Sequence, residues 1–479
     1  MTPVGGARGA RVALAVHPTD PEPDLHEVEV PSLRVARLGR VVGEERMAAL
    51  YSTAATTRAV LGDVAVWNVS STAHGGGVAE MLQLLVGYVK DLGVDVHWAV
   101  IGGDPAFFAL TKRIHNRIHG ASDDGHLGRR DDALYRAVLE PSAAAMGRRL
   151  RPGDVVLLHD PQTVGMAPML AGRGIRIVWR CHIGADQSNR YTEDAWAFLQ
   201  PYLAACDAFV FSHPAFVPPQ LAGREVVIIE PSIDPLSPKN RPLSRSRVVS
   251  LLTGIGLLCG ERTDDRQAIV GDAPPFRVDD RLVVQVSRWD HLKDMAGVME
   301  GFAEHLVRRS DARLALIGPA VTGIADDPEG AQVLAECADA WMSLPARARN
   351  RIRLVTLPLD DIARNALTVN AAQRHATVVV QKSLQEGFGL TVTEAMWKAR
   401  PVLASAVGGI VGQVPPGTGV LLHDPTDLGA FGTALTDLLA RPDDMKRLGR
   451  RARRHVRARY LSDRQLVDHA HLLQRLASA

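Results

Sequence analysis

Short runs of β-branched and apolar residues alternate with longer amphipathic stretches along nearly the whole chain. This alternation is typical of parallel α/β architecture, in which a helix follows each strand and crosses back over the sheet. In the first half, strands are predicted at 63–69, 94–101, 154–159, 175–181, 208–212 and 226–230, and helices at 77–92, 131–149, 163–172 and 192–205. The first half therefore predicts one helix-covered parallel sheet.

A second series of the same kind follows the polar, proline-bearing segment "PSIDPLSPKN" (231–240). Its predicted strands are 281–287, 312–318, 351–356, 376–381, 401–406 and 419–423, and its predicted helices are 294–308, 331–343, 360–374, 392–399, 427–440 and an arginine-rich end from 443 to 479. We therefore predict two Rossmann-like, doubly wound domains, 1–235 and 236–455, followed by a C-terminal helix, 456–479. The lead-in of ~40 residues is expected to be irregular or strand-forming, and "VVSLLTGIGLL" within the ambiguous segment 241–275 fits either a buried helix or a strand.

Bulk properties narrow the class of protein. With 479 residues, 46% hydrophobic and 23% charged, the chain has the length of two domains and the composition of an ordinary globular enzyme. The net charge of +2 gives no broad field for nucleic acid or an anionic membrane. Four cysteines (Cys181, Cys206, Cys259, Cys337) are widely spaced and include no C-x-x-C, so neither a disulfide framework nor a zinc site is indicated. With no signal-peptide pattern and no long apolar run, we expect a cytoplasmic protein.

Basic residues are unevenly distributed between the two common types. Arginine supplies most of the positive charge, and the lysines are Lys90, Lys112, Lys239, Lys293, Lys382, Lys398 and Lys446. Together with the richness in alanine, this indicates a bias in genome composition. A lysine inside a motif is slightly more informative for that reason.

Parallel sheets bind ligands at the carboxyl ends of their strands, and two facing domains form a cleft there. The glycines Gly75, Gly76 and Gly77 follow the strand 63–69 and open the next helix. Glycines let the backbone approach a ligand closely, and a helix N-terminus favours anions. A flexible turn before a helix explains the same three residues equally well.

Arg288 and Lys293 lie in "QVSRWDHLKD", directly after the first strand of the second half. Two cations five residues apart can reach one diphosphate, and each charge-assisted contact contributes about 1.5–3 kcal/mol. The alternative is a solvated turn in which Asp290 and Asp294 are surface partners of these cations.

The segment "KSLQEGFGLTVTEAMWKARPV" (382–402) combines a glycine-bearing loop with a helix start near Thr391. Backbone amides at such a helix N-terminus can bind a diphosphate. Glu386 and Glu394 form an E-x7-E pair, long enough to contact opposite ends of a sugar nucleotide, although Thr391-x-x-Glu394 is also a capping box. The predicted nucleotide-binding residues of this segment are Gly387, Phe388, Gly389, Leu390, Thr391 and Glu394.

Polar residues also follow two strands of the first half. These are His159, Asp160 and Gln162 in "HDPQ", and His182 in "WRCHIG". We expect them to face the cleft as residues that bind the acceptor. The alternatives are that the histidines are hydrogen-bonded structural residues and that Asp160 caps the following helix.

Several motifs in order resemble the trehalose glycosyltransferring synthases, within the retaining glycosyltransferase family 4. They are "GGGVAEM" (75–81), "HDPQ" (159–162), "WRCHI" (179–183), "PSIDPLSPKN" (231–240), "QVSRWDHLK" (285–293), "DDPEG" (326–330), "EGFGLTVTEAMWKARPV" (386–402) and "VGGI" (407–410). The resemblance covers roughly residues 40 to 475 and implies a GT-B fold whose C-terminal helix crosses back to the first domain. Segment 241–275 is longer and more apolar than the family pattern.

The resemblance also implies roles for these residues. Arg288 and Lys293 would clamp the diphosphate, Glu386 would hold the transferred sugar, and Glu394 would hold the ribose. Gly75–Gly77 would close over the diphosphate, and His182 would lie by the C6 hydroxyl of the sugar or by the acceptor. The expected catalytic set is Glu386, His182, Arg288 and Lys293.

The expected reaction is retaining transfer of glucose from UDP-, ADP- or GDP-glucose to glucose, which gives α,α-trehalose in a step that can run in reverse. No tightly bound cofactor or essential metal is expected, since no convincing D-x-D ends a strand, and Mg²⁺ would act only by binding free nucleotide. The expected partners are the sugar nucleotide and the sugar acceptor, with a homodimer as the possible assembly. Three alternatives stay open: a trehalose phosphorylase, a natural-product or pseudo-glycosyltransferase acting on a cyclitol, and a catalytically inactive sugar-nucleotide-binding regulator.

Overall fold

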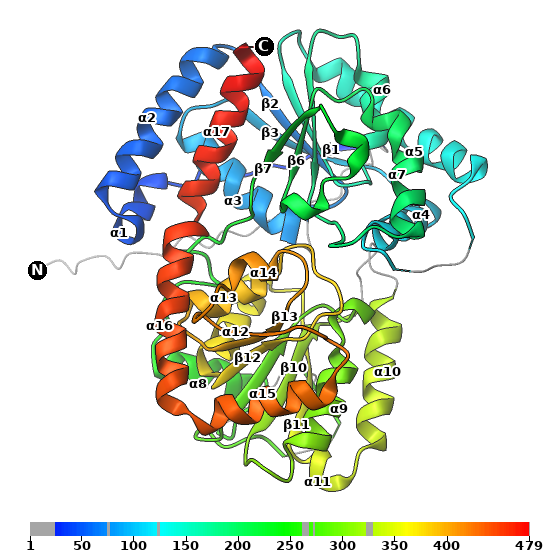
Figure 1. Cartoon of the computed structure of the whole chain (residues 1–479). Coiled ribbons are helices and arrows are strands. Elements are labelled where there is room, and N and C mark those ends of the chain that lie inside the picture. Colours follow the sequence, from blue (N-terminus) through cyan, green and yellow to red (C-terminus); the bar gives the residue numbers. More distant parts are fainter. Residues whose placement is uncertain are drawn as a thin grey trace, which may run out of the picture.

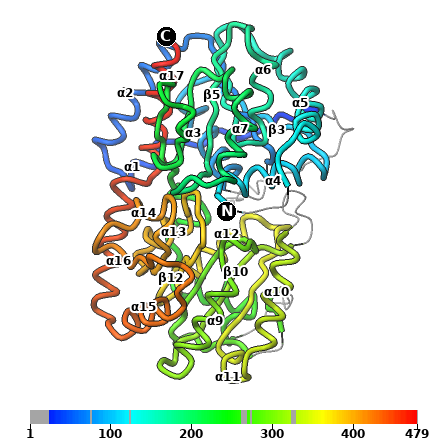
Figure 2. Tube along the Cα trace, turned by 45° about the vertical axis from the view of Figure 1, so that its right-hand side comes forward, coloured from blue at the N-terminus to red at the C-terminus, as the bar shows by residue number. Residues whose placement is uncertain are grey.

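The fold comes from a computed structural model of the chain, which describes residues 24–73, 77–121, 125–260, 268–271, 274–321 and 329–478. Two lobes, each built on one seven-stranded sheet, are stacked along the long axis of the molecule (Figures 1 and 2). Of the sequence motifs, "DDPEG" and part of 241–275 lie largely outside the described residues.

The sheet of the first domain has the order β1-β3-β2-β4-β5-β6-β7 and is parallel except at β1, an antiparallel edge strand. Its strands are β1 Leu25–Glu27, β2 Val66–Ser70, β3 Val96–Ile101, β4 Val155–His159, β5 Arg176–Cys181, β6 Ala208–Phe211 and β7 Glu225–Ile228. The α-helices of this half of the chain are α1 Gly39–Val42, α2 Glu44–Leu61, α3 Gly77–Asp91, α4 Pro105–Ile118, α5 Arg129–Arg149, α6 Ala167–Leu170 and α7 Arg190–Leu203.

The sheet of the second domain has the order β14-β13-β12-β9-β10-β11-β8 and is parallel except at the edge strand β8. Its strands are β8 Ile269–Val270, β9 Leu282–Val286, β10 Arg313–Pro319, β11 Ile352–Leu357, β12 Val378–Gln381, β13 Val402–Ser405 and β14 Val420–Leu422. The α-helices that follow the first domain are α8 Arg245–Gly254, α9 Met295–His305, α10 Gly330–Ser343, α11 Ala346–Arg349, α12 Ile362–His375, α13 Leu390–Trp397, α14 Ile410–Gln413, α15 Leu428–Ala440, α16 Pro442–Arg459 and α17 Ser462–Ser478.

The predicted parallel strands are all present, and the structure adds the two short antiparallel edges, β1 and β8. The ambiguous run "VVSLLTGIGLL" is a helix in its first part, because α8 extends to Gly254 and buries Val248, Leu251 and Leu252. The longest of the helices that were not predicted are α2 and α4. Helix α4 has a well-defined N-terminus. Asp104 caps it by accepting a 2.7 Å hydrogen bond from the amide of Phe107, and Pro105 is the first helical residue.

The chain returns to the first domain at its C-terminal end. The helix predicted over 443–479 is two helices, α16 on the second domain and α17, which packs against α2 of the first (Figure 1). Arg46 of α2 donates to both carboxylate oxygens of Asp463 at 2.6 and 2.7 Å. The crossover runs beside the first interdomain connection, since the amide of Ile233 donates to the carbonyl of Tyr460 at 2.9 Å. This arrangement confirms the predicted return of the C-terminal helix.

Buried side chains fill both faces of each sheet. Separate apolar clusters cover the two faces of the first sheet, and another lies against one face of the second. A further cluster joins α2 and α3 to the second domain through residues such as Leu50, Tyr88 and Leu252. Within the described part of the chain, no helix is long and apolar enough to span a bilayer.

Candidate active site

A cavity of about 390 Å³ lies between the two domains, where the carboxyl ends of both sets of strands meet. Residues after β9 and β12 form one wall, and α3, α4 and the loop after β5 form the other. The residues expected at the site that line this cavity are Gly77, His182, Arg288, Lys293, Glu386, Gly387, Phe388, Gly389, Leu390, Thr391 and Glu394. Gly75 and Gly76 lie outside the described residues.

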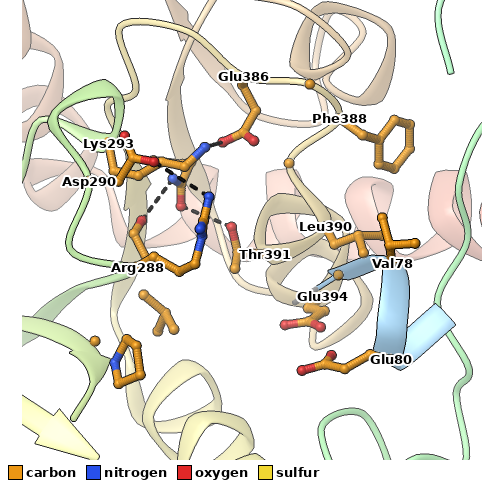
Figure 3. Close-up of a pocket in the computed structure, with 18 of the residues that line it drawn as sticks. Val78, Glu80, Arg288, Asp290, Lys293, Glu386, Phe388, Leu390, Thr391 and Glu394 are labelled. Carbon is orange, nitrogen blue, oxygen red and sulfur yellow. Dashed lines mark hydrogen bonds and ion pairs between the residues drawn. The ribbon is translucent and has the colours of Figure 1, made fainter. Parts of the chain in front are cut away.

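Lys293 and Glu386 are paired on the wall of this cavity that the second domain forms (Figure 3). Lys293 ends a short 3-10 helix after β9, and its Nζ lies 2.8 Å from Oε2 of Glu386. Their side chains are only 16% and 12% exposed. The hydroxyl of Ser383 donates to the same carboxylate oxygen at 3.2 Å. The site thus joins a cation able to hold a phosphate oxygen to a carboxylate able to accept from sugar hydroxyls.

Asp290 fixes the second cation of this wall. Its carboxylate, 2% exposed, lies 3.4 Å from Arg288 and 3.6 Å from Lys112 of α4. Burial alone would raise the pKa of Asp290, but Lys112, Arg288 and Lys293 together hold it well below the usual range. The alternative in which Asp290 is a surface partner is therefore wrong, and this carboxylate orients the two cations.

Helix α13 points its N-terminus into the cavity. Gly389 precedes it with φ 86°, a left-handed conformation that glycine adopts without strain. The hydroxyl of Thr391 donates to Oε1 of Gln381 at 2.9 Å, and none of the described side chains caps the helix. The capping-box alternative for Glu394 is therefore wrong, and the first amides of α13 have the position of an anion site.

Glu394 lies one turn into α13 and is 4% exposed. Its Oε2 has no hydrogen-bond partner among the described residues. Burial raises its pKa, while Lys239 and Lys398 oppose that shift. A buried carboxylate oxygen on the wall of a cavity is suited to accept a hydrogen bond from a ligand hydroxyl.

The two domains approach each other closely around the glycines of the EGFG motif. A Cβ on Gly387 would lie 2.7 Å from the carbonyl oxygen of His182, and one on Gly77 would lie 3.6 Å from Leu390. The amide of Gly408 donates to the carboxylate of Asp186 at 2.7 Å across the same interface. Glycine at position 387 is required by this contact rather than by local backbone conformation.

The polar residues at the strand ends of the first domain form a connected group, in which His159 is buried and Asp160 and His182 are half-buried. His159 Nδ1 lies 3.1 Å from His182 Nε2, and its other ring nitrogen lies 3.1 Å from Asn68 Oδ1. Burial lowers the pKa of both histidines, which keeps them neutral. Asp160, with its pKa raised to about 7 by burial, accepts a 2.7 Å bond from the amide of His182. The helix-cap alternative for Asp160 is therefore wrong, because its carboxylate orients the His182 loop instead.

Of His159, Asp160 and His182, only His182 lines the cavity; His159 and Asp160 are bonded to it but do not belong to the lining. Gln162 is half-buried away from the lining, and its Oε1 has no partner among the described residues. The acceptor roles of His159, Asp160 and Gln162 stay predictions, with His182 as the residue able to touch a ligand.

Two histidines that were not predicted complete the wall of the first domain. His115 and His119 lie one turn apart at the end of α4, with ring centroids 4.8 Å apart, and both line the cavity. Burial and, to a lesser degree, the charge of Lys293 lower the pKa of His119 to about 4. This wall therefore presents neutral imidazoles, which exchange hydrogen bonds with hydroxyl groups without attracting a second phosphate. Among the described residues, no group of three or more His, Cys, Asp or Glu side chains could hold a metal.

A cleft between two facing Rossmann-like domains, with cations, a helix N-terminus and the E-x7-E pair on one wall, defines a GT-B glycosyltransferase. Two family patterns match the chain: "Trehalose synthase, N-terminal domain" over residues 68–218 and "Glycosyl transferases group 1" over 364–455. The chain belongs to the trehalose synthase family of group 1 glycosyltransferases. Sugar nucleotides are the typical donors of the wider family to which these enzymes belong.

Similar proteins support this assignment. The chain is 36% identical to the trehalose synthase of Rubrobacter xylanophilus over 86% of this chain and 90% of that one. It is 33% identical to the trehalose synthase of Pyrococcus horikoshii over 85% and 89%. A solved UDP-forming α,α-trehalose-phosphate synthase from Burkholderia xenovorans shares the fold, with a TM-score of 0.66 at 15% identity over 87% of this chain and 100% of that one.

Proposed function

We propose that the protein transfers glucose from a nucleoside-diphosphate glucose to free glucose, with retention, to form α,α-trehalose and the nucleoside diphosphate, reversibly. The observation that carries the proposal is the 2.8 Å pair of Lys293 and Glu386 beside the N-terminus of α13 in the interdomain cavity. In this pair, Lys293 can bind the departing diphosphate, and Glu386 beside it can bind the transferred sugar.

On the donor side, Arg288, Lys293 and the first amides of α13 stabilise the charge that develops on the diphosphate. Glu386 accepts hydrogen bonds from hydroxyls of the transferred glucose, and Glu394 accepts from the ribose. The bond from C1 to the diphosphate oxygen breaks as the bond from C1 to the acceptor oxygen forms on the same face. The acceptor proton moves to the departing phosphate, so the protein contributes alignment and electrostatic stabilisation. Domain closure excludes water from this step.

On the acceptor side, the neutral imidazoles of His115, His119 and His182 support an uncharged hexose. Lys112, a cation of α4 on that wall, is already held by Asp290 and Glu329 at 3.6 and 3.5 Å. A site built to hydrogen-bond hydroxyls rejects analogues that lack them. Free glucose is therefore the acceptor that we propose, in preference to glucose 6-phosphate.

Product analysis tests the proposal directly. The protein is incubated with UDP-, ADP- or GDP-glucose and, in parallel, glucose, glucose 6-phosphate, glycerate or a cyclitol, and the products are identified by NMR. We expect α,α-trehalose from glucose. A clear preference for another acceptor would contradict trehalose formation but would not contradict the proposed donor site. The absence of transfer from every donor would contradict the whole proposal.

A trehalose phosphorylase is the second candidate. Over 81% of its own length, this chain is 28% identical to the trehalose phosphorylase of Pleurotus pulmonarius. The chain spans 54% of that relative. A phosphorylase needs no nucleotide, so Glu394 would have no ribose to hold. Release of glucose 1-phosphate from trehalose and phosphate, with no binding of nucleoside diphosphates in calorimetry, would favour this alternative.

A further inference from the structure

The segment "PSIDPLSPKN" (231–240) connects the two domains and bonds to one helix of each. Asp234 accepts a 3.0 Å hydrogen bond from the hydroxyl of Tyr88 on α3. Asn240 accepts from Lys398 at 3.0 Å through its side chain and from Trp397 at 3.3 Å through its carbonyl, both at the end of α13. The segment therefore holds α3 and α13 in a fixed relation.

These two helices both begin at the cavity. The start of α3 at Gly77 meets the start of α13 at Leu390, as the 3.6 Å approach of a Cβ on Gly77 indicates. Glu80 lies one turn into α3 and Glu394 one turn into α13, and both line the cavity. Figure 3 shows the two labelled side chains at the same end of the cavity. Two neighbouring carboxylates, one of them buried, are stabilised by a cation nearby.

Lys239 of the connecting segment supplies that cation. Its Nζ lies 2.7 and 2.6 Å from the two oxygens of Glu80, and its side chain lines the cavity with 25% exposure. Burial lowers the pKa of Lys239, but the charges of Glu80 and then Glu394 outweigh this and raise it. Glu80 raises the pKa of Glu394, whereas Lys239 and Lys398 lower it. Two carboxylates, Glu80 and Glu394, thus lie among two ammonium groups, those of Lys239 and Lys398. Of these two lysines, Lys239 is the one that pairs with a residue of the first domain, Glu80.

We propose that Lys239 is a positioning residue for the donor: paired with Glu80 of α3, it places a positive charge at the part of the cavity wall that Glu394 also lines, so that the Glu394 carboxylate is oriented to accept hydrogen bonds from the ribose. A compact ammonium can stand between two carboxylates, which suits lysine better than the planar guanidinium that this chain uses at most basic positions. This inference rests on the proposed function, because it requires a nucleotide ribose at Glu394.

The test compares Lys239→Met, Lys239→Arg and Glu80→Gln with the wild-type protein, using whichever of UDP-, ADP- and GDP-glucose the wild type accepts best and the 2′,3′-dideoxyribose counterpart of that donor. With the natural donor, Lys239→Met is expected to lower kcat/KM by roughly 10- to 100-fold. The KM for the acceptor stays unchanged, and Lys239→Arg retains more activity than Lys239→Met. With the dideoxy donor, the same variant is expected to lose less than about threefold, because the hydroxyls that Glu394 would bind are gone.

Glu80→Gln acts from the other domain and is expected to show the same dependence on the ribose hydroxyls, with a smaller loss. Lys446→Met, at a lysine whose side chain is 73% exposed, is the matched control and should leave kcat/KM unchanged with both donors. If Lys239→Met lowered kcat/KM equally with both donors, or lowered it with neither, the inference would be overturned. A wild-type protein that transfers from none of the three natural donors would instead overturn the proposed function, so the two failures are distinguishable.

Discussion

Replacement of Lys293 by methionine isolates the contribution of its charge to the cavity that it lines, because methionine keeps most of the length of the side chain. In the wild-type protein the Lys293 ammonium, 16% exposed, lies 2.8 Å from Glu386. A charge-assisted contact contributes about 1.5–3 kcal/mol, and removing one donor that stabilises developing charge costs about 2.7–4 kcal/mol in kcat. The variant also leaves the Glu386 carboxylate without its partner cation, beside a departing diphosphate.

We therefore expect Lys293→Met to lose about 3–4 kcal/mol of transition-state stabilisation, or roughly 10²- to 10³-fold in kcat/KM. Arg288→Met should lose less, about 1.5–2 kcal/mol or roughly 10- to 30-fold, because the Arg288 side chain is 41% exposed and solvent screens its charge. Each variant removes one positive charge, so the larger loss expected for Lys293→Met follows from the greater burial of Lys293.

Steady-state release of nucleoside diphosphate measures both variants over a range of donor concentrations, and thermal unfolding verifies that each is folded. Lys446→Met again serves as the control, since its charge is far from the cavity. Near wild-type kcat/KM for a folded Lys293→Met would refute the assignment of the diphosphate site. A greater loss in Arg288→Met than in Lys293→Met would refute the reasoning from burial.

Three further outcomes are expected. Activity should persist in excess EDTA, because cations and helix amides can neutralise the diphosphate, and a complete loss that metal restores would contradict this. Transfer should proceed without a glycosyl-enzyme, so intact-protein mass spectrometry should trap no adduct on Glu386 or Asp160, and NMR should show retention; a trapped adduct would mean a double displacement. Gly387→Ala should lower kcat with little change in the thermal midpoint, because its Cβ would lie 2.7 Å from the carbonyl of His182 and hold the domains apart; unchanged kcat would show that the interface yields.

The sequence predicted the parallel strands, and it also predicted most of the second-domain residues that line the cavity, because both depend on local signals. Strands buried on both faces read as apolar runs, and Glu386 and Glu394 keep a fixed spacing along one loop and helix. The wall of the first domain was harder to predict, because its residues come from separate elements. His115 and His119 escaped notice together with α4, although Asp104 and Pro105 are a recognisable helix start.

Burial, too, could not be read from the sequence alone. Asp290 and Asp294 stand in one short motif, yet Asp290 is 2% exposed and shared between domains, whereas Asp294 bonds to Lys382 within its own domain. Tertiary packing decides which of two neighbouring carboxylates becomes part of a site. The lysines gave a usable signal, because Lys112, Lys239, Lys293, Lys382 and Lys398 are all found in ion pairs or hydrogen bonds at or near the cavity.

The return of α17 to the first domain bears on how the chain is made. Leu472, Leu473 and Leu476 of this helix are buried with Val66, Val96 and Leu82, in a cluster against the first sheet. A ribosome completes these leucines only after the whole second domain has been synthesised. Until then, the nascent first domain exposes the apolar surface that α17 will cover, while the second domain already has all its strands. We therefore expect the domain that is synthesised first to be the last to reach its final stability, and to depend most on protection from aggregation during translation.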